Sequence, residues 1–401
     1  MSVPPAARGF AGVGYDEALH RARALLPLLR EHAAATERAR RMTPEIEAEL
    51  HRSGLFRHLQ PRRWGGMELE FVSYFDIPEM LARGDASTAW SVANLASHHR
   101  GLTLFEPRLQ EEVWSENPDA LIASGIAYAQ GRARKIDGGI VVSGQWSFSS
   151  GIDVSGWCMA ACTVRDSERA IDYRMCLLRS AEYEIIDDWH TLGMRGTGSK
   201  SFRCEELFVP EYRALSMHVA RNGAEFPGYR VNPNPMFRVP TSALGGHCIA
   251  AVIVGDAQAA LEASIDLVGA RSTSYTGAKM RDFQTVQLRI GAAAAKIDAA
   301  RLTLRSDCIE AEAIARSGAP FDMETKLRYK RNAAFAARLC TEAVDGLHEM
   351  AGANGIYEGY PLNRMLRDTR SAAAHISFSL DAQLTPWGLA ALGGEFHSPT
   401  L

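Results

Sequence analysis

Two short stretches of the chain combine glycines with hydroxyl side chains in a spacing that could hold a flat or anionic ligand. The first is Gly193-Met-Arg-Gly-Thr-Gly-Ser199, in which three glycines fall within six residues. Glycine at this density is unfavourable inside a helix or a packed strand, so we expect a loop with accessible backbone amides. Thr197 and Ser199 add hydroxyl groups beside those amides. A tight loop that only joins two strands explains the spacing equally well.

The second stretch, Gly144-Gln-Trp-Ser-Phe-Ser-Ser-Gly151, also joins an aromatic side chain, hydroxyls and a glycine. Each stretch follows a segment with the composition of a β-strand. We therefore expect the two stretches to form loops that are two walls of one site.

Two histidines lie in segments with helical periodicity, among polar or small side chains. Trp90, Asn94 and His98 recur every four residues, so they share one face of a helix. Asp368 and His375 share a face in the same way near the end of the chain, beside a run of alanines. Such a histidine is often only a hydrogen-bonded part of the structure. Their spacings match no metal-binding motif, so we predict no metal site.

Composition and charge exclude several classes of function. The 401-residue chain has a formal net charge of -3 and 46% hydrophobic residues, which gives no support for nucleic-acid binding. The sequence has no run of about 18 apolar residues, which a membrane span needs, and its first residues lack the apolar core of a signal peptide. The seven cysteines are scattered along the chain, as in proteins that keep reduced thiols, and we expect a cytoplasmic location.

The hydrophobic pattern divides the chain into three parts, which predicts an α+β fold. We expect an N-terminal α-helical domain at 1–118, a central small antiparallel β-domain at 119–235 and a C-terminal four-helix-bundle domain at 236–401. Proline and capping residues predict where the first helices break or begin, at Pro27, Thr43-Pro44 and Asp85.

Individual elements of the later parts follow from the same kind of signal. Asp137-Gly-Gly139 predicts a hairpin turn between two strands. Residues 220–240, which are rich in Pro, Asn and Arg, predict a linker. Beyond it, alanine-rich segments predict long helices that pack as a bundle, at Ser242–Ala270, Asp282–Arg316 and Phe321–Ala351, with a final helix at about Pro361–Leu380.

This order of elements, together with a set of short motifs, resembles the acyl-CoA dehydrogenase fold. More closely, it is similar to the oxygenase components of two-component flavin-dependent monooxygenases built on that fold, such as the hydroxylases of 4-hydroxyphenylacetate and of steroid-derived phenols. The resemblance extends from about Tyr15 to Gly394. Its motifs are the two glycine-containing stretches, Leu59-Gln-Pro-x-x-Trp-Gly-Gly66, Ser87-Thr-Ala-Trp90, His98, and Arg367-Asp368 with His375.

The resemblance implies an enzyme that uses reduced flavin and O2. Reduced FMN or FAD would arrive by diffusion from a separate NAD(P)H:flavin reductase and react with O2 to give a C4a-hydroperoxyflavin. This species would hydroxylate a small aromatic substrate, such as a phenol, an indole or a polyketide-like ring. A closed, mostly apolar pocket would protect it from decay to hydrogen peroxide. The resemblance also implies a homotetramer, in which a neighbouring subunit supplies part of each flavin site.

The resemblance also assigns roles to individual residues. His98 would act as the base toward substrate and His375 would lie on the hydroperoxide side, although the two roles are interchangeable at this level. Ser149 would add a catalytic hydroxyl. The resemblance places Trp90, Asn94 and Asp153 at the substrate. It places Trp146, Ser149, Ser150, Arg195, Gly196, Thr197 and Ser199 of one subunit at the flavin, with Arg271, Gly352 and Asn354 of its neighbour.

Three alternatives stay open. An acyl-CoA dehydrogenase needs a carboxylate base, which many members carry shortly after the terminal Arg-Asp, whereas Ala374-His-Ile-Ser-Phe-Ser379 has none before Asp381. A flavin carrier without catalysis would not need both histidines. Oxidation at nitrogen or sulfur would use the same flavin chemistry. Two features depart from the family pattern and bear on substrate orientation. One is Val154, where several relatives carry histidine, and the other is the pair His99-Arg100.

Overall fold

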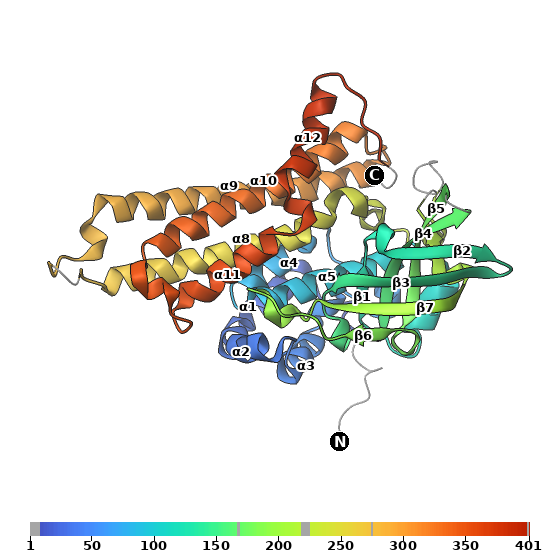
Figure 1. Ribbon diagram of the computed structural model, residues 1–401, viewed down its shortest axis with the longest axis horizontal. Helices are drawn as coiled ribbons and strands as arrows, with labels where there is room; N and C mark the ends of the chain where they lie inside the picture. The colour runs from blue at the N-terminus through green and yellow to red at the C-terminus, as the bar shows by residue number, and fades with distance from the viewer. Residues whose placement is uncertain (1–8, 167–168, 218–224, 274–275, 399–400) are drawn as a thin grey trace.

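A sheet lies at one end of the molecule, and long helices extend away from it (Figure 1). The computed structural model describes residues 9–166, 169–217, 225–273, 276–398 and 401. The helices that precede the sheet in the chain are α1 (Tyr15–Ala24), α2 (Leu26–Ala39), α3 (Pro44–Ser53), α4 (Ser73–Ala82), α5 (Ala86–Leu102) and α6 (Pro107–Trp114).

Local sequence explains where several of these helices begin and end. α1 and α2 are separate helices, with Pro27 in the first turn of α2, which confirms the predicted break. α3 begins at Pro44, as predicted, and Gly54 ends it in a left-handed conformation with a φ of 77°. α5 begins after Asp85, whose carboxylate accepts the Thr88 N–H at 2.8 Å.

Among the described residues, eight strands form one sheet in the order β6-β7-β3-β2-β4-β5-β8, and β1 pairs with β4 outside this path. Most neighbours are antiparallel, as predicted, but β1 and β2 both run parallel to β4. The predicted hairpin joins β2 to β3, with Gly138 in its turn at a φ of 78°. The strands are β1 (Ile122–Gly125), β2 (Gly131–Ile136), β3 (Gly139–Ser149), β4 (Trp157–Asp166), β5 (Arg169–Arg179), β6 (Glu184–Ile186), β7 (Lys200–Pro210) and β8 (Ala214–Ser216).

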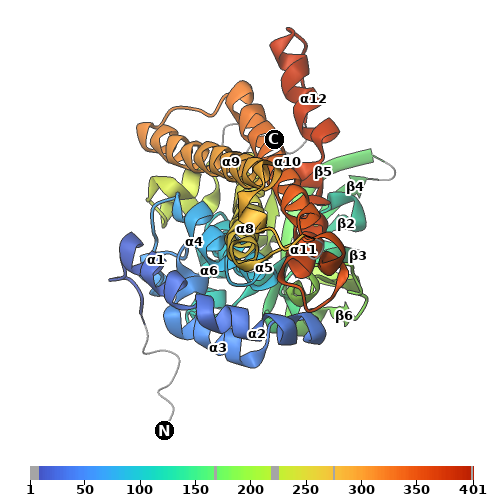
Figure 2. The same cartoon turned by 90° about the vertical axis from the view of Figure 1, so that its left-hand side faces the viewer.

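The C-terminal part is a helical bundle built around α8. Seen end-on in Figure 2, α8 lies in the middle, in contact with α4, α5, α9, α10 and α11. α8 is long and apolar enough to cross a membrane, but 78% of its most apolar window is buried inside the protein. The predicted long helices are confirmed as α8 (Thr241–Ala270), α9 (Gln284–Ser317) and α10 (Met323–Glu349), followed by α11 (Pro361–Ala373) and α12 (Leu380–Ala391).

The prediction of a single final helix is wrong. α11 ends at Ala373, a short 3₁₀ turn covers Ile376–Phe378, and α12 follows. Side chains cause the break, because His375 and Ser379 accept backbone N–H groups at the starts of these two elements. Asp368 and His375 therefore do not share a helix face.

The predicted linker at 220–240 falls partly outside the described residues. Its described part contains two short 3₁₀ turns, Pro227–Arg230 and Pro235–Arg238. Arg100 of α5 is buried and donates hydrogen bonds to the Met236 carbonyl at 3.1 Å and to Thr241 Oγ1 at 2.8 Å. Arg100 therefore attaches the linker to α5, and the expectation that it orients substrate is not supported.

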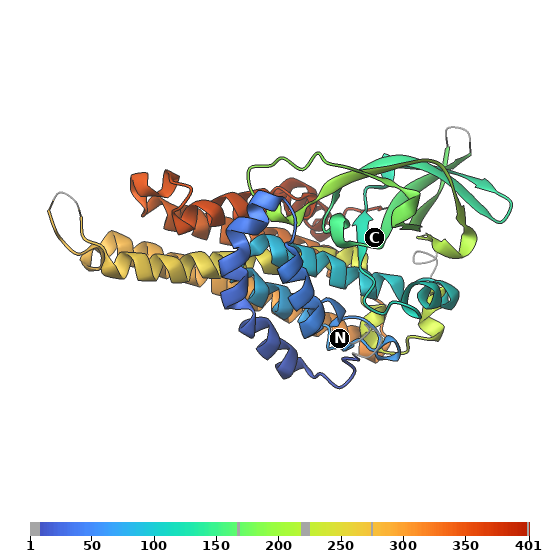
Figure 3. The same cartoon turned by 90° about the horizontal axis from the view of Figure 1, so that it is seen from below.

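The two helical regions share one hydrophobic core, which joins Leu81 and Val92 of the N-terminal helices to Val252 of α8. The sheet has a core of its own around Trp146 and Phe202. Figure 3 shows α1 to α3 lying across the helices of the bundle. The candidate site is built where α5, the sheet and the segment after α11 come together.

Candidate active site

A chain of hydroxyl groups connects the two glycine-containing stretches with α5. The indole N–H of Trp90 donates to Ser150 Oγ at 3.1 Å, and Ser150 Oγ lies 2.7 Å from Ser199 Oγ. Ser199 Oγ lies 2.6 Å from Thr197 Oγ1, whose hydroxyl donates to the Met194 carbonyl at 2.9 Å. All these side chains are buried. The structure thus brings the two stretches into direct contact, and we name Ser150, Ser199 and Thr197 the hydroxyl chain.

An exposed aromatic ring belongs to the same stretch as Ser150, whose backbone N–H donates to the Phe148 carbonyl at 3.1 Å. Phe148 is 69% exposed and has a φ of 66°, in the left-handed region that a bulky residue rarely occupies. Its ring meets that of Trp189 edge to face, with centroids 6.0 Å apart. Unusual backbone of this kind clusters at functional sites, so Phe148 is a candidate ligand contact. The sequence does not predict this role for Phe148, because the motif marks the stretch but no local signal shows the positive φ.

His98 is held as a neutral imidazole with a free nitrogen. Its Nδ1 lies 2.7 Å from the carbonyl oxygen of Ile122, at the start of β1. A carbonyl oxygen only accepts, so Nδ1 carries the proton and Nε2 keeps a lone pair. Burial lowers the pKa of His98 to about 4, which keeps the ring neutral near pH 7. The lone pair of His98 Nε2 is therefore able to accept a hydrogen bond near pH 7.

His375 has the opposite tautomer. Its Nδ1 accepts the backbone N–H of Ser377 at 3.2 Å, so the proton of the neutral ring is on Nε2. Burial lowers the pKa of His375 to about 4 as well. Its ring packs edge to face against Trp90, with centroids 5.9 Å apart, which places it beside the hydroxyl chain. The two histidines therefore differ at Nε2. In His98 this nitrogen has a lone pair and accepts a hydrogen bond, whereas in His375 it carries the proton and donates one.

The glycine-rich loop is fastened to α11. Asp368 accepts the Met194 N–H at 2.6 Å, and Arg367 donates to the Leu192 carbonyl at 2.9 Å. Gly193 packs so closely against α11 that a Cβ atom there would collide with the Arg367 carbonyl oxygen. Helix α11 therefore sets the position of the loop that carries two members of the hydroxyl chain.

The attachment through Asp368 is expected to depend on pH. Burial raises the pKa of its carboxyl to about 7, although the Met194 N–H and Arg364 both lower it. The folded protein therefore keeps a proton that the unfolded chain releases, and stability falls as pH rises from about 4 to about 7. Asp368→Asn removes this titration. As pH rises through that window, the unfolding free energy of the variant should increase relative to that of the wild type by about 1.4 kcal/mol per pH unit. Urea unfolding measures this difference.

The control for this prediction is Asp298→Asn, which removes an exposed carboxylate of α9. Its stability relative to the wild type should change little between pH 4 and pH 7. A stability difference between Asp368→Asn and the wild type that is constant over the same range would contradict the raised pKa of Asp368.

Two predicted site residues, Trp146 and Ser149, point into the sheet and take no part in the hydroxyl chain. Trp146 is 0% exposed, donates to the Ala161 carbonyl at 2.7 Å and stacks on Phe202 with centroids 4.9 Å apart. Ser149 is also buried, with its Oγ 3.7 Å from Cys158 Sγ. The stretch is not a loop here, because β3 continues through Ser149, and a register shift between Trp146 and Ser149 bends its end. Ser150, the next residue, joins the hydroxyl chain instead.

The predicted substrate residues make contacts within the protein. Asp153 pairs with Lys200 Nζ at 2.8 Å, which fixes the turn after β3 to the start of β7. Asn94 donates back to the Trp90 carbonyl at 2.8 Å. Asn94 is half-buried and shares the helix face of Trp90 and His98, so it stays a candidate substrate contact, whereas Asp153 has a structural role.

The remaining predicted flavin residues lie at two places. Arg195 is exposed and donates to the Thr191 carbonyl at 2.6 Å, within the glycine-rich loop. Arg271 follows α8, and Gly352 and Asn354 lie between α10 and α11. These two connections lie at the end of the bundle away from the sheet (Figure 1). One copy of the chain does not bring them to the hydroxyl chain, so they could serve only a site in another copy.

The side chains that depart from the family pattern pack inside the protein, and the Val154 N–H donates to the carbonyl of Gly151, the residue after Ser150, at 3.3 Å. His99 is 0% exposed and stacks on Trp114 with ring centroids 5.7 Å apart. Val154 is half-buried and packs against the helical core. His99 therefore has a structural role, whereas the expectation that Val154 bears on substrate orientation stays a prediction.

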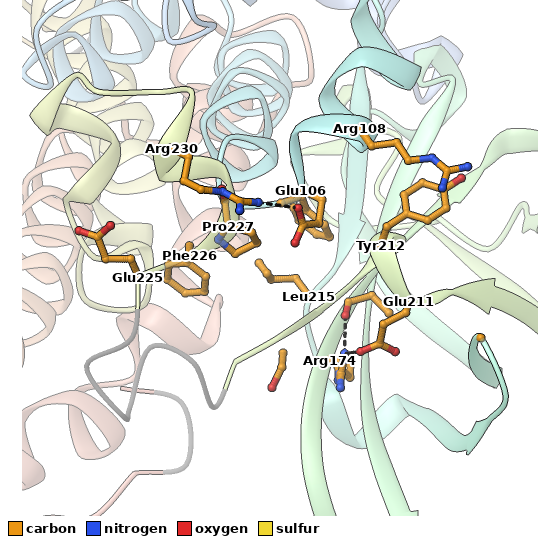
Figure 4. Close-up of a pocket in the computed structure, with 14 residues that line it drawn as sticks. Glu106, Arg108, Arg174, Glu211, Tyr212, Leu215, Glu225, Phe226, Pro227 and Arg230 are labelled. Atoms are coloured by element: carbon orange, nitrogen blue, oxygen red, sulfur yellow. Dashed lines mark hydrogen bonds and ion pairs between the residues drawn. The ribbon is translucent and has the colours of Figure 1, made fainter.

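A cavity of about 1000 Å³ opens at another place, between β5, β8 and the segment around Phe226. Figure 4 shows its charged wall, in which Arg230 pairs with Glu106 at 3.1 Å and Arg174 pairs with Glu211 at 2.6 Å. The predicted site residues do not line this cavity, which is separate from the hydroxyl chain.

Two family models match the chain. The model for the acyl-CoA dehydrogenase N-terminal domain covers residues 23–102, and the model for the acyl-CoA dehydrogenase C-terminal domain covers residues 247–380. The protein thus has the acyl-CoA dehydrogenase fold, as its sequence predicted.

Similar proteins show which family with this fold the chain belongs to. The flavin-dependent monooxygenase oxygenase subunit HsaA of Rhodococcus jostii (strain RHA1) is 32% identical over 382 residues, which cover 95% of this chain and 98% of that protein. The oxygenase component of an FADH(2)-dependent resorcinol hydroxylase from Rhizobium sp. is 33% identical and covers 92% of each chain. The crystal structure of 3-HSA hydroxylase from Rhodococcus sp. RHA1 matches with a TM-score of 0.91 at 31% identity, over 96% of this chain and 99% of that one. The chain belongs to the family of flavin-dependent monooxygenase oxygenase subunits.

Proposed function

We propose that this chain is an oxygenase component that uses reduced flavin and O2 to hydroxylate a small aromatic substrate. The observation that carries the proposal is the pair of neutral histidines with opposite tautomers, one of them packed on the tryptophan that begins the hydroxyl chain. A dehydrogenase would need a carboxylate base instead. Asp368 holds the Met194 N–H, and the segment 374–379 that follows it carries no carboxylate.

The residues of the site fit a flavin. Phe148 presents an exposed ring that a flat ligand can contact, and the hydroxyl chain presents polar atoms beside it. When bound, reduced flavin supplies electrons to O2. We favour FAD over FMN, because the resorcinol hydroxylase is FADH(2)-dependent, and we infer a separate NAD(P)H:flavin reductase from the component names of the relatives.

The tautomers of the two histidines assign their roles. His98 Nε2 accepts the proton of a phenolic hydroxyl, which makes the ring carbons of the substrate more nucleophilic. His375 keeps a proton on Nε2 and donates a hydrogen bond to oxygen. The hydroxyl chain and Trp90 hold the space between the sheet and α5 in one geometry.

We also propose a homotetramer in the cytoplasm. Leu288 and Leu302 of α9 are 72% and 69% exposed and Phe335 of α10 is 51% exposed, as expected for an interface between copies. A neighbouring copy would bring Arg271 and its surroundings to the flavin. All seven cysteines are free, as in a reducing compartment. Sedimentation of the purified 43.9 kDa chain tests the assembly, and a monomer would contradict it.

The proposal predicts oxygenated product only when the chain, a flavin reductase, NAD(P)H, flavin and O2 are all present. We expect a phenol to gain one oxygen atom from isotopically labelled O2, measured by mass spectrometry across a panel of phenols, indoles and thioethers. If thioethers were the only compounds of the panel that gave product, the substrates would be compounds that are oxidised at sulfur. Release of hydrogen peroxide with no product, together with reduction of an artificial acceptor by acyl-CoA, would establish a dehydrogenase instead.

A further inference from the structure

Helix α12 buries a single residue, and that residue is polar. The structure describes the whole of α12, and only Gln383 is buried in it. The helix has other anchors on α10, because Arg331 lies over the ring of Trp387 at 4.2 Å and Leu384 lines the same cavity as Phe335. A buried amide contributes less to packing than an apolar side chain of similar size, since it gives up its hydrogen bonds to water. Packing alone therefore does not explain a glutamine at this position.

The amide of Gln383 is bound in one direction. Its Nε2 donates to the Ile376 carbonyl at 2.9 Å, in the 3₁₀ turn Ile376–Phe378 between α11 and α12. A carbonyl only accepts, so the NH2 group must face it and the amide oxygen must point away. That oxygen is buried and accepts no hydrogen bond from any described residue. The side chain thus spends its described hydrogen bond on the turn that follows His375.

The peptide group that Gln383 holds is also the one that binds the ring of His375. The Ile376 carbonyl and the Ser377 N–H belong to the same peptide bond, and this N–H donates to His375 Nδ1 at 3.2 Å. Because the peptide group is planar, a donor that holds its oxygen also fixes the direction of its N–H. A hydrogen bond to the oxygen polarises the peptide and makes the N–H a stronger donor. The Ser379 N–H reaches the same oxygen at a longer distance, 3.3 Å.

Packing holds the side chains of the turn rather than this peptide group. The side chain of Ile376 is 66% exposed, whereas that of Phe378 is buried. Helix α8 approaches the turn at Gly246, where an added Cβ would lie 3.4 Å from Ser377 Cβ. These contacts fix the end of the turn and its distance from α8. The direction of the peptide between Ile376 and Ser377 is left to its hydrogen bonds, of which that from Gln383 is the shorter at the oxygen.

We propose that Gln383 is a positioning residue that sets the tautomer of His375 through the peptide between Ile376 and Ser377. Without the amide, this peptide can rotate, and Nδ1 can lose its donor. The neutral ring can then carry its proton on either nitrogen. The inference rests on the proposed function only for the consequence, because the hydrogen bond that we assign to His375 Nε2 needs the proton on that nitrogen.

The first test measures the tautomer and needs no flavin. In protein labelled with 15N in its histidine rings, the two tautomers give different ring nitrogen shifts, and the signals of His375 are those that His375→Asn removes. We expect the Nε2–H form in the wild type. Gln383→Leu has a side chain of similar size that cannot donate, so it should show a mixture of both forms. The wild-type tautomer in undiminished population in Gln383→Leu would overturn the inference.

Gln383→Glu makes the same effect depend on pH within one protein, so the result does not rest on the folding of Gln383→Leu. A protonated carboxyl can donate to the Ile376 carbonyl, whereas a carboxylate cannot and is repelled by it. Burial raises the pKa of a carboxyl, which brings its titration into the assay range. His375 stays neutral over this range, because burial lowers its pKa to about 4.

The measured quantity is product formed per NAD(P)H consumed, relative to the wild type at the same pH. For Gln383→Glu we expect a value close to that of the wild type at about pH 5.5 and a value about two- to tenfold lower at about pH 8, the size of one hydrogen bond. Gln383→Leu should give the low value at both. A Gln383→Glu variant with the same relative value at both pH values would contradict the inference.

Leu384→Ala is the matched control on the same helix. It weakens the packing of α12 but leaves the amide of Gln383 in place, so it should unfold at lower urea concentration and keep both the tautomer and the product yield. Equal losses of yield in Leu384→Ala and Gln383→Leu would overturn the inference. A changed tautomer with an unchanged yield would support it and contradict the role that the proposed function gives His375. A wild type that forms no product contradicts the proposed function, and the tautomer then decides the inference by itself.

Discussion

Replacing His98 by alanine is expected to lower the rate of product formation by about 10²–10⁴-fold, the usual contribution of a general base. Its Nδ1–H is anchored 2.7 Å from the Ile122 carbonyl, and its lowered pKa of about 4 leaves Nε2 unprotonated at neutral pH. The variant should still bind reduced flavin, and the electrons of that flavin should reduce O2 to hydrogen peroxide. Product and peroxide formed per NAD(P)H consumed measure both effects.

The control variant His98→Asn separates the position of the side chain from its basicity. The amide can still donate to the Ile122 carbonyl, but it cannot take up a proton. We expect it to be as stable as the wild type and as inactive as His98→Ala. A phenol that is already ionised at the assay pH needs no base, so its rate should fall much less. Equal losses for ionised and un-ionised phenols would contradict the assignment of His98.

The pKa of His98 also predicts how activity depends on pH. Because burial lowers it to about 4, the base stays available at neutral pH and is lost only as pH falls toward 4. A product-forming step that loses activity with a midpoint near pH 6.5 would show that the ring is more exposed to water than the structure indicates.

Replacing Gly193 by alanine is expected to destabilise the protein by about 1–3 kcal/mol and to weaken flavin binding. The added Cβ would collide with the Arg367 carbonyl oxygen. Both partners are backbone, so they can separate only if the hydrogen bond from Met194 to Asp368 is strained or broken. The displaced loop would carry its two hydroxyls away from Ser150. Urea unfolding measures the first effect, and equilibrium dialysis with reduced flavin measures the second.

Gly156→Ala is the matched control for Gly193→Ala. A Cβ atom at Gly156 would meet no heavy atom within 4 Å, so we expect a change of at most about 0.5 kcal/mol. Similar losses in both variants would show that the loss at Gly193 does not come from contact with α11.

Local signals predicted most of the fold, because each depends on chemistry within one turn of the chain. Pro27 and Asp85 marked helix starts in this way, and Gly138 marked a hairpin. The final helix was predicted too long, since helical periodicity continues through His375 whereas the capping bonds of His375 and Ser379 end one element and begin the next.

For the site, the sequence by itself determined the residue types and the stretches that carry them, because motifs and family resemblance depend only on order along the chain. Tertiary structure alone decided which atoms meet. Ser150 rather than Ser149 joins Ser199, because β3 bends at its end and leaves Ser149 inside the sheet. The proton of His98 is placed by a carbonyl of β1 from 24 residues further along the chain. No periodicity encodes contacts between groups so far apart, and these contacts set the tautomer of His98 and decide which serine joins the hydroxyl chain.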